Sequence, residues 1–152
     1  MSRFSALLLA LALIPPVSAA QSAKIGIFDK QAIVIAYYRS PQWAAVLKEK
    51  QTELEQAKRD NNQAQVQQLN AWGEQSQALA HSQPAGEATI NNIMDALQPA
   101  FLEIERSAGV TGFVPCPCPS LTAPAVDVTP QLLDWLHADA ATRKIVQDLS
   151  HK

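Results

Sequence analysis

The sequence predicts a mostly helical α+β protein, in which both ends of the chain form a small β-sheet body and a long antiparallel helical arm is inserted between them. Short strand-like segments lie near both ends, at Lys24–Asp29, Val110–Val114 and Ala125–Thr129. The long stretch between the first two is rich in the helix formers Gln, Ala, Glu, Lys and Leu. Its apolar residues recur in narrow stripes, which is typical of antiparallel helices packed along a seam. The expected body comprises residues 24–40 and 109–152, and the expected arm residues 41–108.

The first 20 residues have the three parts of a cleaved signal peptide. Arg3 gives a positive start, and a run dominated by apolar residues follows from Phe4 to Ile14. Pro15 and Pro16 then break any helix, and small residues up to Ala20 offer acceptable cleavage sites. The apolar run is shorter than the roughly 20 residues that a membrane-spanning helix needs. We therefore expect an exported protein whose mature part, residues 21–152, is a single domain that does not span a membrane.

The charge of the chain is small and unevenly distributed. The formal net charge is −2, and no Lys or Arg occurs between Asp60 and Glu105. A nucleic-acid partner would call for a basic patch, which this composition does not supply. We therefore expect no nucleic-acid binding. The stretch from Lys24 to Arg59 should be mildly basic and that from Asp60 to Glu105 clearly acidic.

The segment Lys30–Tyr38, which follows the first expected strand, is apolar on almost all sides. Its β-branched run Ile33-Val34-Ile35 favours a strand, whereas its Ala, Lys and Gln residues are equally compatible with a helix. The sequence leaves this choice open. In either case the segment has to be covered by the rest of the chain or by a partner.

The helical stretch begins and is interrupted at recognisable signals. Ser40-Pro41 combines a capping residue with a proline at the first helical position. Asp60-Asn61-Asn62 favours a turn, so a break is expected there. A break would shorten the arm to about 30 Å, at 1.5 Å per helical residue. Gln83–Gly86 predicts a second turn.

A third helical segment is expected from Glu87 to Ala108, with a bend at Pro99 and a stop at Gly109. Beyond the next strand, the prolines around the two cysteines exclude a sheet interior. Two further helices are expected, from Thr129 to about His137 and from Ala140 to Leu149. A sheet of two or three short strands leaves open edges, which favours association of subunits.

Two motifs at the ends of this arrangement resemble those of the Skp/OmpH-like periplasmic chaperones. They are KIGIFDKQAIVIAYYRSP at Lys24–Pro41 and VDVTPQLLDWL at Val126–Leu136, separated by a helical insertion and preceded by the signal peptide. The resemblance implies a periplasmic homotrimer with a shared sheet body, whose helical hairpins enclose unfolded outer-membrane proteins without ATP. The chain departs from the family in its shorter arm, its acidic charge and the Cys-Pro-Cys-Pro stretch.

Catalytic and metal-binding patterns are lacking in the sequence. There is no glycine-rich phosphate loop, no serine nucleophile motif and no His-Glu-x-x-His. The histidines, His81, His137 and His151, are scattered and lie near expected helix ends or the chain terminus. We therefore expect a protein that is not an enzyme and binds neither cofactor nor metal.

The one sharp local feature is Cys116-Pro117-Cys118. Two thiols in an oxidising compartment usually become oxidised, so a labile disulfide and a bridge between subunits are both open, and a shared metal site is a weaker alternative. The stretch could equally be a proline-rich loop without a special role. Tyr37 and Tyr38 are candidate oligomer contacts, which the enrichment of aromatic residues at interfaces favours, or they are part of the body core. Trp43, Trp72 and Trp135 are expected to pack in helical seams.

Three functions remain open at this stage. The leading hypothesis is a holdase that shields unfolded chains between helical arms. The first alternative is an envelope scaffold or interaction protein whose arm seam is closed on itself. The second is a thiol redox or metal-binding protein that uses Cys116 and Cys118.

Overall fold

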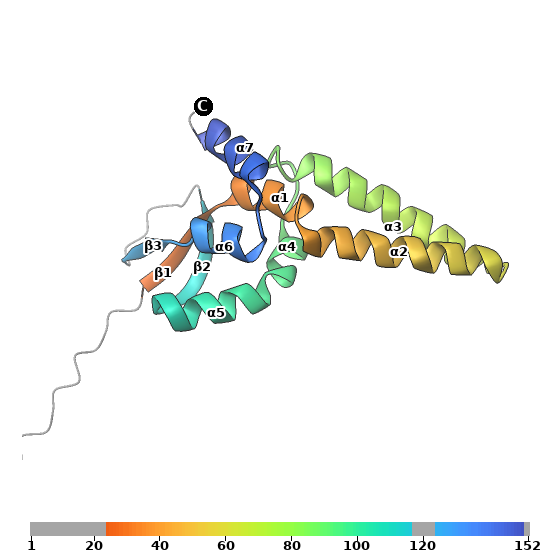
Figure 1. Ribbon diagram of the computed structural model, residues 1–152, viewed down its shortest axis with the longest axis horizontal. Helices are drawn as coiled ribbons and strands as arrows, with labels where there is room; N and C mark the ends of the chain where they lie inside the picture. The colour runs from red at the N-terminus through yellow and green to blue at the C-terminus, as the bar shows by residue number, and fades with distance from the viewer. Residues whose placement is uncertain (1–23, 117–123, 151–152) are drawn as a thin grey trace, which may run out of the picture.

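The computed structural model describes residues 24–116 and 124–150, and the expected signal peptide at 1–20 lies outside these residues. A small parallel sheet of three strands is surrounded by helices, and a pair of helices projects from this body (Figure 1). The prediction of a mostly helical α+β protein with a small sheet is confirmed. The elements are β1 (Lys24–Asp29), α1 (Lys30–Tyr38), α2 (Pro41–Arg59), α3 (Gln63–Ser82), α4 (Asn91–Ala96), α5 (Gln98–Ala108), β2 (Val110–Cys116), β3 (Ala125–Asp127), α6 (Thr129–Trp135) and α7 (Ala140–Ser150).

The strands lie in the order β2-β1-β3, and both pairs are parallel. Asp29 pairs with Cys116 in β2, and Ile27 pairs with Asp127 in β3. Parallel neighbours require a crossover connection, and the helices α1 to α5 provide it between β1 and β2. The antiparallel arrangement expected for the inserted helices therefore does not extend to the sheet. Gly26 is required in β1, because a Cβ there would lie 2.8 Å from the Phe113 ring.

The ambiguous segment Lys30–Tyr38 is the helix α1. The Asp29 side chain caps it by accepting a hydrogen bond from the Ala32 N–H at 3.0 Å. Helices α2, α6 and α7 all contact α1, so its apolar residues are covered on several sides by the chain itself. Burial on several sides thus overrides the β-propensity of Ile33, Val34 and Ile35.

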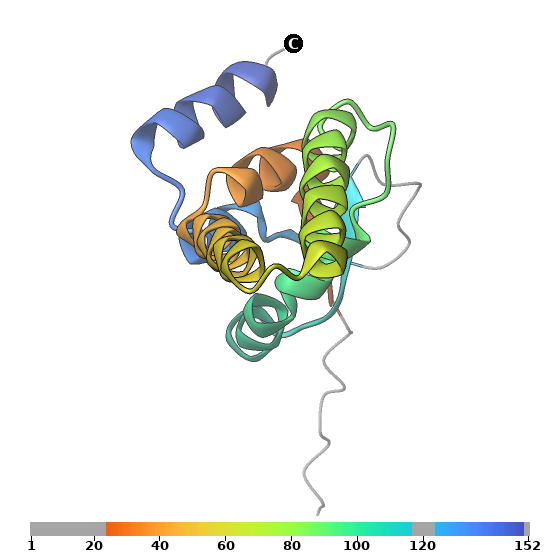
Figure 2. The same cartoon turned by 90° about the vertical axis from the view of Figure 1, so that its right-hand side faces the viewer.

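The two projecting helices, α2 and α3, form a hairpin that extends away from the sheet (Figures 1 and 2). Ser40 caps α2 by accepting a hydrogen bond from the Trp43 N–H at 3.1 Å, as expected. The break at Asp60–Asn62 is also present, and Asn61 has a φ of 53°. The 19 residues of α2 give the arm a length of about 28 Å.

The third helical segment does not belong to the arm, so the expected arm at 41–108 is too long. Its bend and its stop occur where expected, because α4 ends before Pro99 and Gly109 adopts a left-handed conformation with φ 64°. The buried face of α4 and α5 packs on the sheet, however, with the Phe101 ring 6.2 Å from that of Phe28 and 4.3 Å from that of Phe113. The arm therefore ends at Ser82, and α4 and α5 are part of the body.

One continuous core lies between the sheet, α1, α4, α5 and α6. Helix α6 is tied to β1 by a hydrogen bond from the Asp29 N–H to the Thr129 hydroxyl at 2.9 Å. The core is built from residues of elements far apart in the chain, among them Phe28, Ile33, Ile93, Leu97, Phe101, Val110, Val128, Leu132 and Leu136.

Candidate functional site: the groove between the arm helices

The seam between α2 and α3 is only partly closed. Of the residues of these two helices, all of which the structure describes, Ala57 alone is buried. Leu47 is 45 % exposed, and the other apolar residues of the seam, including Leu54, Leu69 and Trp72, are half-buried. The arm therefore presents apolar surface along its length.

This surface is hollowed into an outer groove of about 590 Å³. Its apolar lining comes from Leu47 and Leu54 of α2 and from Leu69, Trp72 and Gly73 of α3. A Cβ added at Gly73 would meet no atom within 4 Å. Gly73 therefore leaves open space in the groove. No close contact with another backbone segment requires a glycine at this position.

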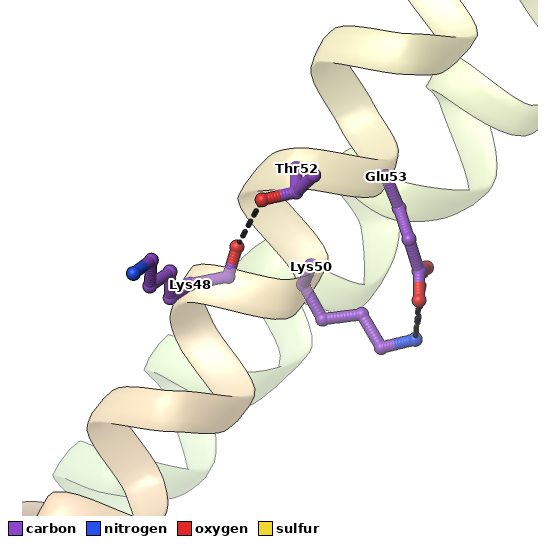
Figure 3. Close-up of polar contacts among 4 residues, drawn as sticks. All are labelled: Lys48, Lys50, Thr52 and Glu53. Carbon is purple, nitrogen blue, oxygen red and sulfur yellow. Dashed lines mark hydrogen bonds and ion pairs between the residues drawn. The ribbon is translucent and has the colours of Figure 1, made fainter.

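The rim of the outer groove carries a cation that is already paired. The Lys50 ammonium lies 2.9 Å and 3.0 Å from the two carboxylate oxygens of Glu53 (Figure 3). On the other side of α2, away from this groove, the Thr52 hydroxyl donates to the Lys48 carbonyl at 2.9 Å (Figure 3). The rim is consequently polar, and Glu74 of α3 adds a further carboxylate to it.

A second, inner groove of about 280 Å³ lies at the base of the arm, where the arm joins the body. Tyr37 and Tyr38 of α1, Trp43 of α2 and Trp72 of α3 form its aromatic wall. The Trp43 ring lies 5.6 Å from Tyr37, 5.2 Å from Tyr38 and 6.1 Å from Trp72, between ring centroids. None of the described residues that line this groove is charged. Trp72 lines both grooves, so they adjoin one another.

A buried glutamine, Gln83, holds the base of the arm to the body. Gln83 is 1 % exposed, and its amide oxygen accepts a hydrogen bond from the Tyr38 hydroxyl at 2.7 Å. Its amide nitrogen donates to the Thr89 carbonyl and to the Asn92 side-chain oxygen, both at 2.6 Å. The end of α3 is thereby connected to α1 and α4. Gln83 was expected only as a turn residue, and its polar partners come from segments that no local sequence signal brings together.

Both candidate contact tyrosines belong to this junction. Burial raises the pKa of Tyr37, and the neighbouring Tyr38 adds to the effect. Burial also raises the pKa of Tyr38, against a smaller opposite effect of the Asn92 hydrogen bond. Tyr37 is 7 % exposed and packs on Trp43 within its own chain. Their role in contacts between subunits stays a prediction. Trp43 and Trp72 pack in the seam as expected.

The structure places Cys116 at the end of β2, away from the arm, where it is disulfide-bonded. Cys118 lies outside the described residues, so the alternatives for the pair stay predictions. Cys116 is at the edge of a cavity of about 670 Å³ at the carboxyl ends of the strands. The two carboxylates there are used locally, because Asp29 caps α1 and Asp127 accepts from the Thr129 hydroxyl at 2.6 Å.

Within residues 24–116 and 124–150, no group of three or more His, Cys, Asp or Glu side chains is arranged to hold a metal ion. In the same part of the chain, no helix combines the length and the apolar character needed to cross a membrane. The grooves of the arm are the candidate surface for holding a partner, because apolar and aromatic side chains line them. Comparison of the chain with protein-family models, curated proteins and solved structures finds no match.

Proposed function

We propose that this protein is an exported, periplasmic holdase that binds unfolded outer-membrane proteins without ATP, and that its arm groove holds their apolar segments. The observation that carries the proposal is the open seam between α2 and α3, with a single buried residue in the two helices. A holdase needs adaptable apolar surface that competes with the self-association of its clients. A two-helix arm with an unfilled groove supplies such a surface.

The motifs at Lys24–Pro41 and Val126–Leu136, which resemble those of the Skp/OmpH-like chaperones, support the same proposal. The proposed working form is a homotrimer. In its favour, β2 and β3 each pair only with β1 among the described residues and so leave an edge open. Several arms around one body would then surround a client.

The charge of the arm leads us to propose short-range apolar binding over long-range attraction. No Lys or Arg occurs between Asp60 and Glu105, and the Lys50 ammonium is paired with Glu53. Salt weakens attraction between separated charges beyond a Debye length of about 8 Å at physiological strength, but it hardly weakens apolar contact. Binding by this arm should therefore depend little on salt.

The test is light scattering of a urea-unfolded outer-membrane β-barrel protein diluted with and without the purified protein, at low and at high salt. We expect suppression of aggregation in both conditions without ATP. Leu47→Gln should weaken it, because Leu47 lines the outer groove and is 45 % exposed. Leu102→Gln is the matched control, since Leu102 is 52 % exposed on α5 of the body.

No suppression at several-fold molar excess would contradict the holdase and favour an envelope scaffold or interaction protein. Equal loss in the two leucine variants would show that the groove is not the binding surface. Loss of suppression in the Cys116→Ser, Cys118→Ser variant alone would favour the thiol alternative.

A further inference from the structure

The cavity of about 670 Å³ at the carboxyl ends of the three strands is not used by the holdase function proposed above. Each strand brings its last residue to the wall of this cavity, namely Asp29 of β1, Cys116 of β2 and Asp127 of β3. The start of α1 and the turn at residues 83–86 also line it, and the Gln31 side chain joins them by donating to the Pro84 carbonyl at 3.3 Å. Proteins hold small molecules in pockets of about 300–1,000 Å³, so the cavity has the size of a small-molecule site.

The cavity lies where open parallel sheets hold ligands. In the strand order β2-β1-β3, the chain leaves β1 toward one side of the sheet and later returns to its other side. The strand order therefore reverses between β1 and β3. At such a reversal the connections leave the strand ends in opposite directions, which opens a crevice at the carboxyl ends. Asp29 and Asp127, at the ends of these two strands, both line the cavity.

Three charged side chains line the cavity among the described residues, and each of them can accept a further partner. Asp29 caps α1 through Oδ1 alone, which accepts from the Ala32 N–H. Asp127 also uses Oδ1, which accepts from the N–H and the hydroxyl of Thr129. Within the described residues, neither carboxylate makes a hydrogen bond through Oδ2, and the Lys30 ammonium makes neither a hydrogen bond nor an ion pair.

This combination of charges discriminates between ligands. An anion would be attracted by Lys30 but repelled by two carboxylates, and a cation would meet the carboxylates but be repelled by the Lys30 ammonium. Only a molecule with both kinds of charge satisfies all three groups. Asp29 and Lys30 are half-buried, so solvent and salt screen their contacts less than those of fully exposed charges.

We propose that this cavity binds a small zwitterionic molecule with an α-ammonium and an α-carboxylate group, as a free amino acid or a short peptide has. The ammonium lies against the Oδ2 atoms of Asp29 and Asp127, and the carboxylate lies against the Lys30 ammonium. An uncharged side chain lies along Ile27 and Pro84, which belong to the apolar part of the lining. The site is independent of the holdase function, because none of these residues lines either groove of the arm.

The test is titration of the isotope-labelled mature protein with three forms of one dipeptide, followed by amide chemical shifts. Glycylleucine has both charged ends, N-acetyl-glycylleucine lacks the ammonium, and glycylleucine amide lacks the carboxylate. We expect glycylleucine to bind about tenfold more tightly than either other form, because hydrogen bonds between charged groups are the stronger ones. The shifts should include the amides of Gln31 and Gly86, which line the cavity.

Free leucine, titrated in parallel, distinguishes the two sources of the ligand. Tighter binding of glycylleucine identifies a short peptide as the ligand, and tighter binding of leucine identifies a free amino acid. Equal affinities for the three dipeptide forms would overturn the proposal. So would the absence of shifts in the cavity amides with leucine and with glycylleucine, each added up to about 10 mM.

Two variants test the charged groups separately. Lys30→Gln should weaken glycylleucine about tenfold without weakening its amide, which has no carboxylate to lose. Asp127→Asn should weaken glycylleucine without weakening the N-acetyl form, and it keeps the Oδ1 acceptor that bonds to Thr129. Lys48→Gln is the matched control, since Lys48 is an exposed lysine of α2 that does not line the cavity. Equal losses in the Lys30 and Lys48 variants would contradict the placement of the carboxylate.

Discussion

Replacement of Gln83 by alanine should destabilise the junction between arm and body more than any exposed change in the arm. The substitution removes three hydrogen bonds, to the Tyr38 hydroxyl, the Thr89 carbonyl and the Asn92 side chain. Gln83 is 1 % exposed. Water would therefore replace only part of the hydrogen bonds that its three partner groups lose. At about 0.5–1.5 kcal/mol for each of the three bonds, the expected loss in the free energy of unfolding is about 1.5–4.5 kcal/mol.

The measurement is urea unfolding followed by circular dichroism, together with a thermal melt. A loss of about 3 kcal/mol, the middle of this range, corresponds to a fall in Tm of roughly 10 °C for a domain of this size. Gln77→Ala is the control, because Gln77 is an exposed residue of α3 and should change stability by less than about 0.5 kcal/mol. The double variant with Tyr38→Phe should show a coupling energy of about 1 kcal/mol. The reasoning is refuted if Gln83→Ala and Gln77→Ala unfold alike.

Three further changes have expected outcomes. Because burial raises the pKa of Tyr37 and Tyr38 above 10.0, the fold favours their neutral forms. The stability that they contribute is complete below pH 10 and is lost as the pH rises above it. In urea unfolding, the double Phe variant should lose less stability than the unmodified protein over this range. A hydrogen bond from the backbone at the start of α7 lowers the pKa of Asp139 below 3.8. Its contribution to stability is therefore present above pH 3.8 and is lost as the pH falls further. Asp139→Asn should make stability depend less on pH in this acid range, as measured by the helical circular dichroism signal. The pair Cys116→Ser and Cys118→Ser should leave helical content and Tm nearly unchanged, because Cys116 ends β2 outside the helical seams; a large fall in Tm would contradict this.

Local signals in the sequence predicted several helix boundaries, although α4 begins at Asn91 and not at the expected Glu87. Ser40 caps α2, Asn61 interrupts the hairpin and Gly109 ends α5, each at the expected position. Each of these features depends on a few neighbouring residues, because a cap or a left-handed turn is decided by local backbone and side-chain chemistry. The seam positions of Trp43 and Trp72 could also be predicted from the sequence, because helical periodicity alone specifies them.

The length of the arm and the direction of the strands depend on distant contacts. The stripe of Ile93, Leu97, Phe101 and Ile104 has the same spacing whether it packs on another helix or on a sheet. It packs on the sheet because Phe28 and Phe113 lie opposite it. The helical state of Lys30–Tyr38 was undecided for a related reason, because its cover by α2, α6 and α7 depends on the tertiary fold.

The open seam links the stability of the arm to its proposed activity. A hairpin with one buried residue gains little from its own interface, so its order depends mainly on the aromatic junction and on Gln83 at its base. Any ligand that binds the ordered groove stabilises the arm by mass action, in proportion to RT ln(1 + [L]/Kd). Closing the groove from within, as Gly73→Leu does, should stabilise the arm and weaken binding together. A change that raised both arm stability and client affinity would show that the groove is not where clients bind.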